Sequence, residues 1–397
     1  MYKSDFPIFK TQKKPFVFFD TAASAQKPAV VIKAMSEMYK TCYANVHRGL
    51  YRLSDEASAA FEQARQTVAQ FIGAQSQDII WTRGATESIN LVAHSFGQTL
   101  KAGDEIVLSV AEHHSNLVPW QVLRDQKGVV LKFVPVFPNG LPDMKVYAGS
   151  LTKKTKLVAM THMSNVLGTV FPVEEMIKQA HQVGAKVLID GTQSIVHRPV
   201  NVARMGCDFF VFSGHKLYGP TGIGVLYAPH AWMNTLPPYQ TGGQMIKTVT
   251  LEKTTYAESP ARFEAGTPPI VEAIGLAKAI DYVKSIGWDK IQKHEERISA
   301  LLMQTLADCL FVEPLGAWAE KKGLVAFNIK GVHAYDVGTF LGLSGLAVRV
   351  GLHCAEPLAQ AFHVPGSVRI SLGLYNDEKD IQALAAALAK LKKVYAL

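Results

Sequence analysis

The sequence predicts an α/β fold with a mostly parallel central sheet and a smaller α+β domain at its C-terminal end. Short apolar runs alternate with segments whose apolar residues recur at helical spacing, which implies crossover connections between parallel strands. Some of these runs end directly on polar residues, as Val187–Ile189 does on Asp190. The carboxyl edge of an open α/β sheet is where ligands bind, so the sequence also predicts the location of a site.

The composition is that of a folded globular protein. Hydrophobic residues make up 48% of the 397 residues and charged residues 19%, which excludes an intrinsically disordered chain. The longest apolar runs fall short of the roughly 18 residues that a membrane span needs. Residues 1–14 have neither the apolar core nor the cleavage site of a signal peptide. We therefore expect a cytoplasmic protein that does not bind membranes.

The four cysteines are Cys42, Cys207, Cys309 and Cys354. Their wide spacing matches neither a C-x-x-C metal motif nor a disulfide framework, so we expect reduced thiols and no metal site. The net charge of +8 raises nucleic acid as a partner, but lysines and arginines are scattered and form no dense tract. We interpret the excess of positive charge as a preference for anionic ligands or acidic partner surfaces. A basic binding module without catalysis is the alternative, and it would be colourless and bind nucleic acid in a salt-sensitive way.

The large domain is expected over residues 16–287. Its strands are predicted at 16–19, 78–81, 105–110, 129–136, 157–160, 187–189, 209–212 and 222–228. Its helices are predicted at 28–39, 54–73, 86–97, 116–126, 173–183 and 270–286. Ser54 is a typical helix start, and Gly84 makes the turn before a helix that Thr86 opens.

The small domain is expected over residues 288–397, with residues 1–15 packed against it. Gly287–Asp289 marks the boundary because a glycine follows the long helical pattern there. Helices are predicted at 289–310, from 334 and from 377, and strands near 311, at 324–329 and at 367–372. The sequence contains no internal repeat or low-complexity tract.

Lys216 and Asp190 form the strongest pair of candidate site residues. Lys216 follows the buried run Phe209–Phe212 on a glycine-containing loop, where desolvation would lower the pKa of its amine and favour Schiff-base chemistry. Asp190 ends another strand at the same sheet edge. A carboxylate opposite a Schiff-base lysine is what pyridoxal phosphate (PLP) requires, because it keeps the pyridine nitrogen protonated. Taken singly, Lys216 could be a solvated loop lysine and Asp190 a helix N-cap.

Further polar residues share this edge. Backbone amides at the helix that Thr86 opens can bind phosphate, a role compatible with capping by Thr86. His113 and His114 could bind a metal, but adjacent side chains point apart and no carboxylate pattern supports one, so stacking of His113 on a flat ring fits better. The basic loop at 44–53 carries His47 and could hold a carboxylate substrate, although it could equally be an ordinary surface loop.

With these residues in place, the chain closely resembles the group II cysteine desulfurases of the class V aminotransferase family, which are fold-type I PLP enzymes. The similarity covers nearly the whole chain and includes F-F-D-T-A-A-S-A-Q-K-P, N-V-H-R-G, R-G-A-T-E-S-I-N, A-E-H-H-S-N-L-V-P-W, M-S-N-V-L-G, D-G-T-Q, S-G-H-K-L-Y-G-P-T-G, E-A-G-T-P and R-V-G-L-H-C-A-E-P. S-G-H-K with D-G-T-Q is specific for the cofactor family, and R-x-G-x-H-C-A for the subgroup. The resemblance implies a seven-stranded, mostly parallel sheet and a homodimer.

The resemblance also implies roles for single residues. Lys216 would form the Schiff base with PLP, Asp190 would face the pyridine nitrogen, and His113 would stack on the ring and donate a proton. Further cofactor contacts would come from Gln193 at the ring hydroxyl, from Ala85, Thr86, Ser213 and His215 at the phosphate, and from Thr267 of the neighbouring subunit. Asn165 would contact both cofactor and substrate, and Arg369, Arg349 and His47 would bind the substrate, Arg369 holding its carboxylate in a bidentate pair.

Cys354 is the expected sulfur carrier. Its loop contains Arg349 and His353, and positive neighbours favour the thiolate that nucleophilic attack needs. Taken alone, Cys354 could be a core cysteine and Arg369 a surface ion pair. The loop departs from the family pattern at Val350 and Leu352, where a small or hydroxyl residue and a His or Gln are commoner.

The predicted function is therefore PLP-dependent removal of sulfur from L-cysteine, which yields L-alanine and a persulfide on Cys354 for a sulfur-acceptor protein or an iron–sulfur scaffold. Selenocysteine lyase activity on L-selenocysteine stays open. Another PLP reaction, such as transamination, epimerisation or β-elimination, is the rival, since a fold alone does not fix function. Cys354 discriminates between them, because a transaminase needs no thiol there.

Overall fold

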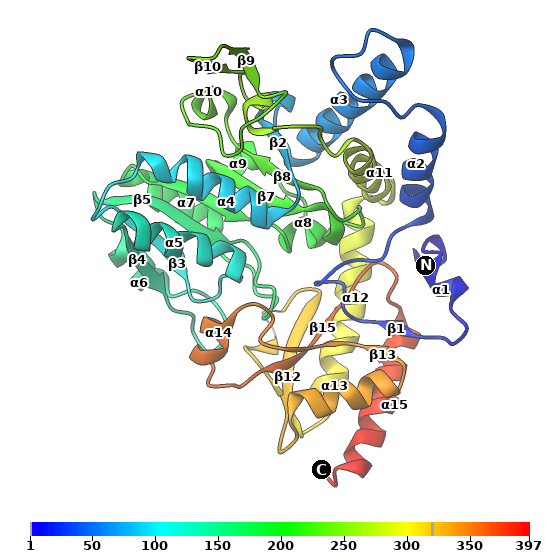
Figure 1. The fold of residues 1–397 in the computed structure, drawn as a ribbon. Coiled ribbons are helices and arrows are strands. Elements are labelled where there is room, and N and C mark those ends of the chain that lie inside the picture. The colour runs from blue at the N-terminus through cyan, green and yellow to red at the C-terminus, as the bar shows by residue number, and fades with distance from the viewer. Residues whose placement is uncertain (1, 319–320) are drawn as a thin grey trace.

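A computed structural model describes residues 2–318 and 321–397 of the chain, and its centre is a seven-stranded sheet (Figure 1). The strands lie in the order β2 (Ile79–Thr82), β8 (Gly224–Tyr227), β7 (Phe209–Ser213), β6 (Lys186–Asp190), β5 (Thr155–Thr161), β3 (Glu105–Ser109) and β4 (Val130–Val134). Only β8 runs antiparallel to its neighbours. The predicted α/β class and the seven-stranded, mostly parallel sheet are confirmed.

Both faces of this sheet are buried, which explains why its strands have nearly continuous apolar sequences. In β6, Val187 and Ile189 face one apolar core while Leu188 faces another. The first core packs against α2 (Ala29–Thr41), α3 (Arg52–Ile72), α7 (Val173–Gln182), α8 (Ser194–His197), α9 (Val202–Met205) and α11 (Ile270–Ile286). The second packs against α4 (Ala85–Ser95), α5 (Val118–Lys127) and α10 (His230–Met233).

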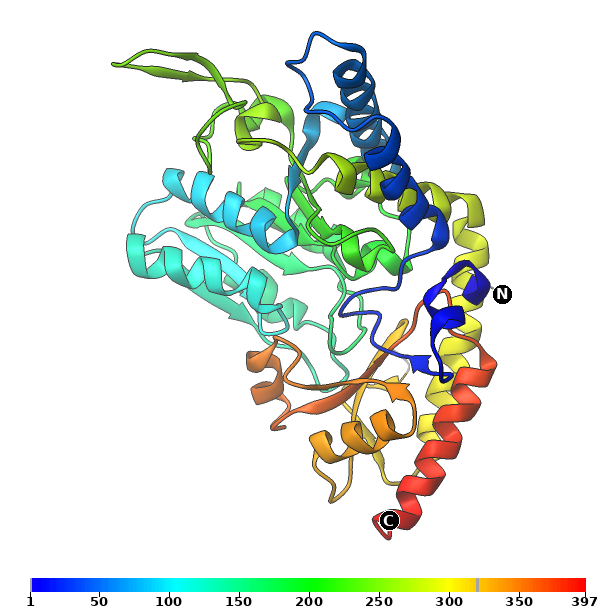
Figure 2. The ribbon, with the colours of Figure 1, turned by 45° about the vertical axis from the view of Figure 1, so that its right-hand side comes forward.

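A second, antiparallel sheet lies below the first in Figure 1. Its strands are ordered β11 (Val312–Pro314), β12 (Leu324–Ile329), β15 (Ser367–Ser371) and β14 (Arg349–Gly351). α12 (Trp288–Ala307), α13 (Ala334–Leu343) and α15 (Glu378–Val394) pack on its own apolar core. Figure 2 shows α12 and α15 side by side along this unit. We propose that the two sheets define two domains that meet at Gly287, where α11 ends and α12 begins.

The N-terminal segment contacts both sheet units. After η1 (Tyr2–Asp5) and α1 (Ile8–Thr11), β1 (Val17–Phe18) pairs in parallel with β13 (Leu346–Ala347) of the small unit. Lys3 Nζ lies 2.6 Å from Asp380 Oδ1 on α15. Phe6 instead packs edge-on against Tyr282 of α11. The segment therefore links the two units.

Two expected helix starts differ in detail from the structure. α3 begins at Arg52 rather than at Ser54, because the Ser54 hydroxyl donates a hydrogen bond to the carbonyl of Asn45 and so holds the preceding loop. α4 begins at Ala85, and Thr86 makes no capping hydrogen bond. Gly84 at the N-cap position provides no capping side chain, and although the Ala85 amide donates to Ser213 Oγ, the following amides of the first turn stay available to a ligand.

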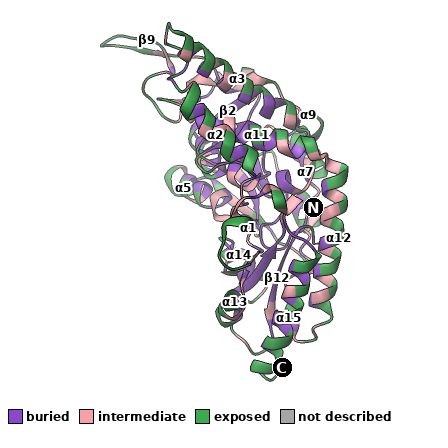
Figure 3. Ribbon diagram, turned by 90° about the vertical axis from the view of Figure 1, so that its right-hand side faces the viewer, coloured by how far each residue is buried: buried purple, intermediate pink, exposed green. Residues whose placement is uncertain are grey.

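Some short elements lie where the sequence carries little periodic signal. They are α6 (Met144–Ser150), α14 (Glu356–Ala361) and the hairpin of β9 (Ile246–Val249) and β10 (Thr254–Tyr256). The hairpin projects from the body as a largely exposed ribbon, whereas the sheet strands are buried (Figure 3). Within the part of the chain that the structure describes, none of the helices has the length and apolar character required to span a lipid bilayer.

Candidate active site

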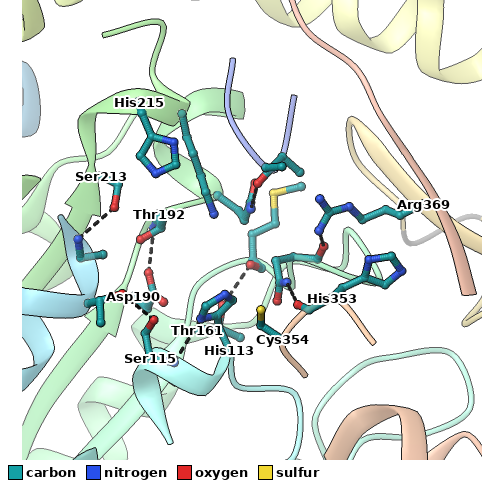
Figure 4. Close-up of a pocket in the computed structure, with 18 of the residues that line it drawn as sticks. His113, Ser115, Thr161, Asp190, Thr192, Ser213, His215, His353, Cys354 and Arg369 are labelled. Carbon is teal, nitrogen blue, oxygen red and sulfur yellow. Dashed lines mark hydrogen bonds between the residues drawn. The ribbon is translucent and has the colours of Figure 1, made fainter. Parts of the chain in front are cut away.

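A cavity of about 300 Å³ opens at the carboxyl edge of the large sheet, where the small unit meets it (Figure 4). The large unit lines it with the ends of β5, β6 and β7 and the start of α4, and the small unit with β14, β15 and the loop after β14. The lining residues are Ala22, Ala23, Ala85, Thr86, His113, Ser115, Thr161, Met163, Asn165, Asp190, Thr192, Gln193, Ser213, His215, Lys216, Arg349, His353, Cys354 and Arg369.

Lys216 ends the short 3-10 turn η5 (Gly214–Lys216), which follows β7. The turn is tightly enclosed, since a Cβ on Gly214 would lie 2.7 Å from the Ile223 side chain. Burial lowers the pKa of the Lys216 amine to about 8, assisted by the charge of Arg369 and opposed by Asp190. A substantial fraction of the amine is thus neutral near physiological pH, which nucleophilic attack on a carbonyl requires.

Asp190 is the last residue of β6 and is only 7% exposed. One carboxylate oxygen, Oδ1, accepts a hydrogen bond from the Thr192 amide at 2.9 Å. It is not the N-cap of the following helix, because α8 begins at Ser194 with Gln193 in the cap position. The Thr192 hydroxyl is buried and has no hydrogen-bond partner among the described residues. Asp190 therefore presents a carboxylate to the cavity from a fixed strand end.

His113 lies between β3 and α5 and faces the cavity. Its Nδ1 accepts a hydrogen bond from the Ser115 amide at 3.1 Å, which directs the Nε2 edge of the ring away from the backbone. Burial, with a contribution from Lys216, lowers the pKa of His113 to about 4, so the imidazole is neutral at pH 7.

A buried polar network supports this segment from below. Glu112 Oε1 accepts hydrogen bonds from Ser109 Oγ and the Thr161 amide, and Oε2 accepts one from Asn116 Nδ2 at 2.7 Å. Asn116 Oδ1 in turn accepts from Trp120 Nε1. Burial raises the pKa of Glu112 to about 7 despite these donors. The network joins β3, β5 and α5 directly beneath His113.

The start of α4 forms a polar end of the cavity. Ser213 Oγ accepts a hydrogen bond from the Ala85 amide at 2.9 Å, and Thr86 Oγ1 lies 2.7 Å from Ser115 Oγ. The backbone approach here needs glycine, because a Cβ on Gly224 would lie only 2.4 Å from the Cα of Gly84. The combination of hydroxyl groups and the free amides that follow Ala85 at the helix start is suited to binding an anion.

The opposite end carries two arginines that share one carboxylate. Asp20 accepts hydrogen bonds from Arg349 Nε and Nη2 at 3.0 and 2.9 Å, and from Arg369 Nη2 at 3.3 Å. Arg369 is 3% exposed, and its Nη1 donates to the carbonyl of Asn165. Its buried Nε has no partner among the described residues. Arg369 thus keeps donor capacity for a carboxylate ligand.

Cys354 is exposed, on the loop between β14 and α14. Its carbonyl accepts a hydrogen bond from the His114 amide at 2.8 Å, and the carbonyl of His353 accepts one from Asn165 Nδ2 at 2.7 Å. His353 and Cys354 both have left-handed backbone conformations, with φ of 55° and 56°. These contacts fix the backbone and leave the thiol at the cavity mouth, as Figure 4 shows.

The expected contribution of His353 to the local positive charge is wrong. His353 is buried and its Nε2 lies 3.2 Å from the carbonyl of Ser367, which requires Nε2 to carry a proton. Burial and the charge of Arg369 lower the pKa of His353 to about 3, so the ring is neutral. The positive charge near Cys354 therefore comes from Arg349, Arg369 and Lys216.

Two expected site residues lie outside this cavity of the single chain. Thr267 is exposed and lines a separate surface pocket beside Glu264. His47 is also exposed, and its ring nitrogens contact Glu62 Oε1 and Gln244 Nε2 at 3.1 and 2.7 Å. Thr267 was expected to serve a neighbouring subunit, so its distance from the cavity of its own chain is compatible with that expectation.

Sequence reasoning did not include several residues that line or shape the cavity. They are Asp20, Ser115, Thr161, Met163 and Thr192, together with the alanines at 22 and 23. Asp20 carried a usable signal, because it directly follows an apolar strand, as Asp190 does.

The other cysteines lack the setting of Cys354, and burial raises the pKa of Cys207 to about 12. Among the described residues, no group of three or more His, Cys, Asp or Glu side chains is arranged to hold a metal.

The sequence model of the family described as aminotransferase class-V matches residues 17–384. A cysteine desulfurase from Salmonella agona strain SL483 is 46% identical over 397 residues, which cover 99% of this chain and 98% of the relative. Two solved structures are also similar. The apo cysteine desulfurase from Thermococcus onnurineus NA1 has a TM-score of 0.94 and 38% identity, covering 98% of this chain and 97% of that one. The Escherichia coli cysteine desulfurase CsdA in its S-sulfonic acid form has a TM-score of 0.92 and 36% identity, covering 99% and 98%.

Proposed function

This chain belongs to the class-V aminotransferase family, and from that membership and its cavity we propose that it is a PLP-dependent cysteine desulfurase. In this reaction sulfur is removed from L-cysteine, L-alanine is released, and the sulfur stays on Cys354 as a persulfide. The observation that carries the proposal is an exposed cysteine at the mouth of a cavity that also holds Lys216, Asp190 and Arg369.

The residues present fit PLP. The cavity has a carboxylate at Asp190 for a protonated ring nitrogen and a partly neutral amine at Lys216 for covalent attachment. The free amides at the start of α4, together with Ser213, Thr86 and His215, suit a phosphate group. Gln193 is held by a hydrogen bond from its Nε2 to the carbonyl of Ala22, which leaves its oxygen free for a ring hydroxyl. When bound, PLP supplies an electron sink for the carbanion formed when an amino acid loses its α-proton.

Residues of both units would position the substrate and move its protons. Arg369 would bind the carboxylate of L-cysteine with its remaining donors, while Asn165 holds the neighbouring loop. Lys216 would accept the α-proton, since its lowered pKa provides a neutral amine. His113 is neutral and its Nδ1 accepts from the Ser115 amide, so its one ring proton is on Nε2, from which His113 would donate.

Cys354 would perform the sulfur transfer. Its thiolate attacks the sulfur of L-cysteine, so an S–S bond forms and the Cβ–S bond of the substrate breaks. The electron pair of the broken bond would stay on Cβ, which takes up a proton to become the methyl group of alanine, and Cα would take back a proton from Lys216. The substrate thiol hydrogen remains on the terminal sulfur of the persulfide. A thiol acceptor or a reductant then removes that sulfur, so turnover without one should be slow.

The finer parts of the proposal concern partners. A homodimer would bring the exposed Thr267 of one subunit to the phosphate end of the other site. Thr267→Val should then weaken cofactor retention by about 1 to 3 kcal/mol, the loss expected for a charge-assisted hydrogen bond. A fully active monomer at high dilution would contradict the shared site. The sulfur acceptor would be a protein or an iron–sulfur scaffold, and L-selenocysteine would be an alternative substrate.

One assay tests the proposed function most simply. The purified protein, loaded with PLP, is incubated with L-cysteine and dithiothreitol, and alanine and sulfide are quantified. Equal amounts of alanine and sulfide support a desulfurase. Pyruvate and ammonia in place of alanine would instead identify β-elimination, and a colourless protein that fails to bind PLP would reject the family chemistry for this chain.

A further inference from the structure

Thr267 lies in a loop, residues 264–269, that connects the 3-10 turn η6 (Ala261–Phe263) to α11. The Thr267 side chain is exposed, and Gly266 before it has a φ of 84°, in the left-handed region that favours glycine. Because a loop lacks the hydrogen-bond ladder of a helix or a strand, the position of Thr267 depends on the groups that hold the loop from outside.

Glu264, at the start of the loop, is held by buried groups. Its Oε1 and Oε2 accept hydrogen bonds from Arg65 Nη1 and Nη2 at 2.6 and 2.9 Å. Oε1 also accepts one from the Trp81 amide at 2.7 Å. The side chains of Arg65 and Glu264 are only 3% and 8% exposed. This bidentate pair ties the loop to α3, which carries Arg65, and to β2, which carries Trp81.

Arg65 fits this position because each of the five N–H groups of its guanidinium has an acceptor. Besides the two that donate to Glu264, one donates to the carbonyl of Ile79 at 2.9 Å and two to Glu62 at 3.0 and 3.4 Å. The guanidinium carbon also lies 5.5 Å from the ring centroid of Trp81. A lysine has three donors and no planar fork, so it could not make the same set of contacts.

A second set of contacts holds the loop from its other side. The Gly266 amide donates to the carbonyl of Gly243 at 2.9 Å. The next residue, Gln244, reaches the exposed ring of His47, with its Nε2 2.7 Å from His47 Nδ1. Water competes for exposed hydrogen bonds, so we expect the buried ion pair of Arg65 to contribute more to the position of the loop.

The burial of this ion pair indicates a role beyond stability. The desolvation of two buried charges offsets much of their attraction, and apolar residues of similar volume often stabilise a fold equally well or better. The bidentate pair, in contrast, fixes both the distance and the orientation of Glu264 relative to α3. What it fixes in this chain is the loop that carries Thr267, three residues further on.

We propose that Arg65 is a positioning residue for the shared site, which acts through Glu264 to hold Thr267 at the phosphate of PLP in the neighbouring subunit. The inference rests on the proposed homodimer, in which Thr267 serves the partner's site. Arg65 lies on α3, away from the described lining of the catalytic cavity in its own chain. Its replacement should therefore weaken PLP retention in the partner's cavity and not in its own.

Two heterodimers that contain the same two substitutions test this inference. In the first, one subunit carries Arg65→Lys and the other carries Lys216→Ala. In the second, one subunit carries both substitutions and the other carries neither. Each heterodimer is purified through a different affinity tag on each subunit, loaded with PLP and diluted into buffer without PLP. At intervals, borohydride fixes the remaining PLP to the single Lys216, and mass spectrometry quantifies the modified peptide.

The first heterodimer should release PLP as slowly as a reference heterodimer that carries only Lys216→Ala, because its Lys216 site receives Thr267 from a subunit with intact Arg65. The second should release PLP about five-fold faster or more, as expected when a charge-assisted hydrogen bond is weakened. Glu264→Gln in place of Arg65→Lys should give the same pattern, and it replaces Arg65→Lys if that variant does not fold.

Arg297→Lys is the matched control, because Arg297 pairs with Glu378 on the exposed surface of the small unit, and it should leave PLP release unchanged in both arrangements. Equal release from the two heterodimers, or faster release from the first, would overturn the inference, since Arg65 would then not act on the partner's site. Unchanged release from a Thr267→Val homodimer would reject the shared site itself, and this inference with it. The homodimer therefore distinguishes a failure of the proposed dimer from a failure of Arg65 alone.

Discussion

The two sides of the catalytic cavity are built in different ways. On the large-sheet side, Asp190 and Ser213 are the last residues of parallel strands and are 7% and 6% exposed. On the small-sheet side, Cys354 is exposed on a loop with two consecutive left-handed residues. Groups that would hold a cofactor are thus buried on rigid elements, whereas the group that would carry sulfur is open to solvent. A sulfur carrier must meet an acceptor, which explains why the two sides differ.

Lys216→Ala should have the largest effect, because it removes the attachment point and the base on the rigid side at once. We expect alanine formation from L-cysteine to fall by about 1000-fold or more, which is the upper range for loss of a general base. The visible colour of the loaded protein should change as well. Lys278→Ala, an exposed lysine on α11, is the control and should retain both colour and activity. If Lys216→Ala still turns over L-cysteine, the proposed cofactor site on the large-sheet side of the cavity is contradicted.

Arg369→Gln should weaken substrate binding without loss of the cofactor. Arg369 is 3% exposed with a free Nε, so its replacement should raise KM for L-cysteine about 10- to 100-fold. Arg349→Gln is the matched control, because Arg349 is exposed and both its contacts go to Asp20. Its effect on KM should be several-fold smaller. If the two variants raise KM equally, the effect of Arg369→Gln comes from the lost contact with Asp20 and not from a lost contact with the substrate.

His114→Ala should have a moderate effect on the chemistry of Cys354, on the small-sheet side of the cavity. His114 Nε2 accepts a hydrogen bond from the Glu356 amide at 3.2 Å, and its own amide donates to the Cys354 carbonyl. Loss of the side-chain acceptor should slow persulfide formation about five-fold, as expected for a hydrogen bond worth about 1 kcal/mol. PLP retention should not change. His114→Gln offers an acceptor oxygen and should recover most of the rate; if it is as slow as His114→Ala, the hydrogen bond is not the cause.

The pH dependence of stability tests the large-sheet side of the cavity through Glu112. Its pKa is raised to about 7 in the folded chain from an ordinary 4.5, so the folded state binds the proton more tightly than the unfolded state. The contribution of Glu112 to stability is therefore full below about pH 4.5 and is lost as the pH rises to about 7. The loss is at most about 3 kcal/mol, since one pKa unit corresponds to about 1.4 kcal/mol.

The measurement is the thermal midpoint of unfolding between pH 5 and 7.5. Glu112→Gln should flatten the decline of the midpoint with rising pH, although its absolute midpoint will fall because an amide cannot accept from all three donors. Glu105→Gln, at the start of β3, is the control. The Lys132 ion pair and hydroxyl donors lower the pKa of Glu105, so its contribution is lost in the opposite direction, as the pH falls. An unchanged slope in Glu112→Gln would contradict the buried-acid explanation.

Most of the large-sheet side could be predicted from the sequence, because each of its groups directly follows a recognisable apolar strand. Asp190 and Ser213 are examples, and β6 and β7 end where the apolar runs end. Asp20 also follows an apolar strand, but its ion pairs reach Arg349 and Arg369, more than 300 positions away in the sequence. Such a contact depends on how the N-terminal strand pairs with β13, and no local pattern reveals that.

The geometry of the sulfur side was less accessible to prediction. Proximity in sequence suggested that His353 adds positive charge near Cys354, but tertiary burial keeps its ring neutral. His353 and Cys354, which have left-handed conformations, are likewise held by contacts with Asn165 and the His114 backbone, which lie far away in the sequence. Long-range packing, rather than local propensity, determines this half of the site.

The most direct test of the account locates the transferred sulfur. The loaded protein is incubated with ³⁵S-labelled L-cysteine without reductant, alkylated and digested, and each cysteine peptide is analysed for label and for the added sulfur mass. The account predicts label on the peptide containing Cys354 alone, and no labelled peptide from Cys354→Ala, although that variant keeps its colour and its spectral response to L-cysteine. Label on Cys42, Cys207 or Cys309, or alanine formation at the wild-type rate by Cys354→Ala, would contradict it.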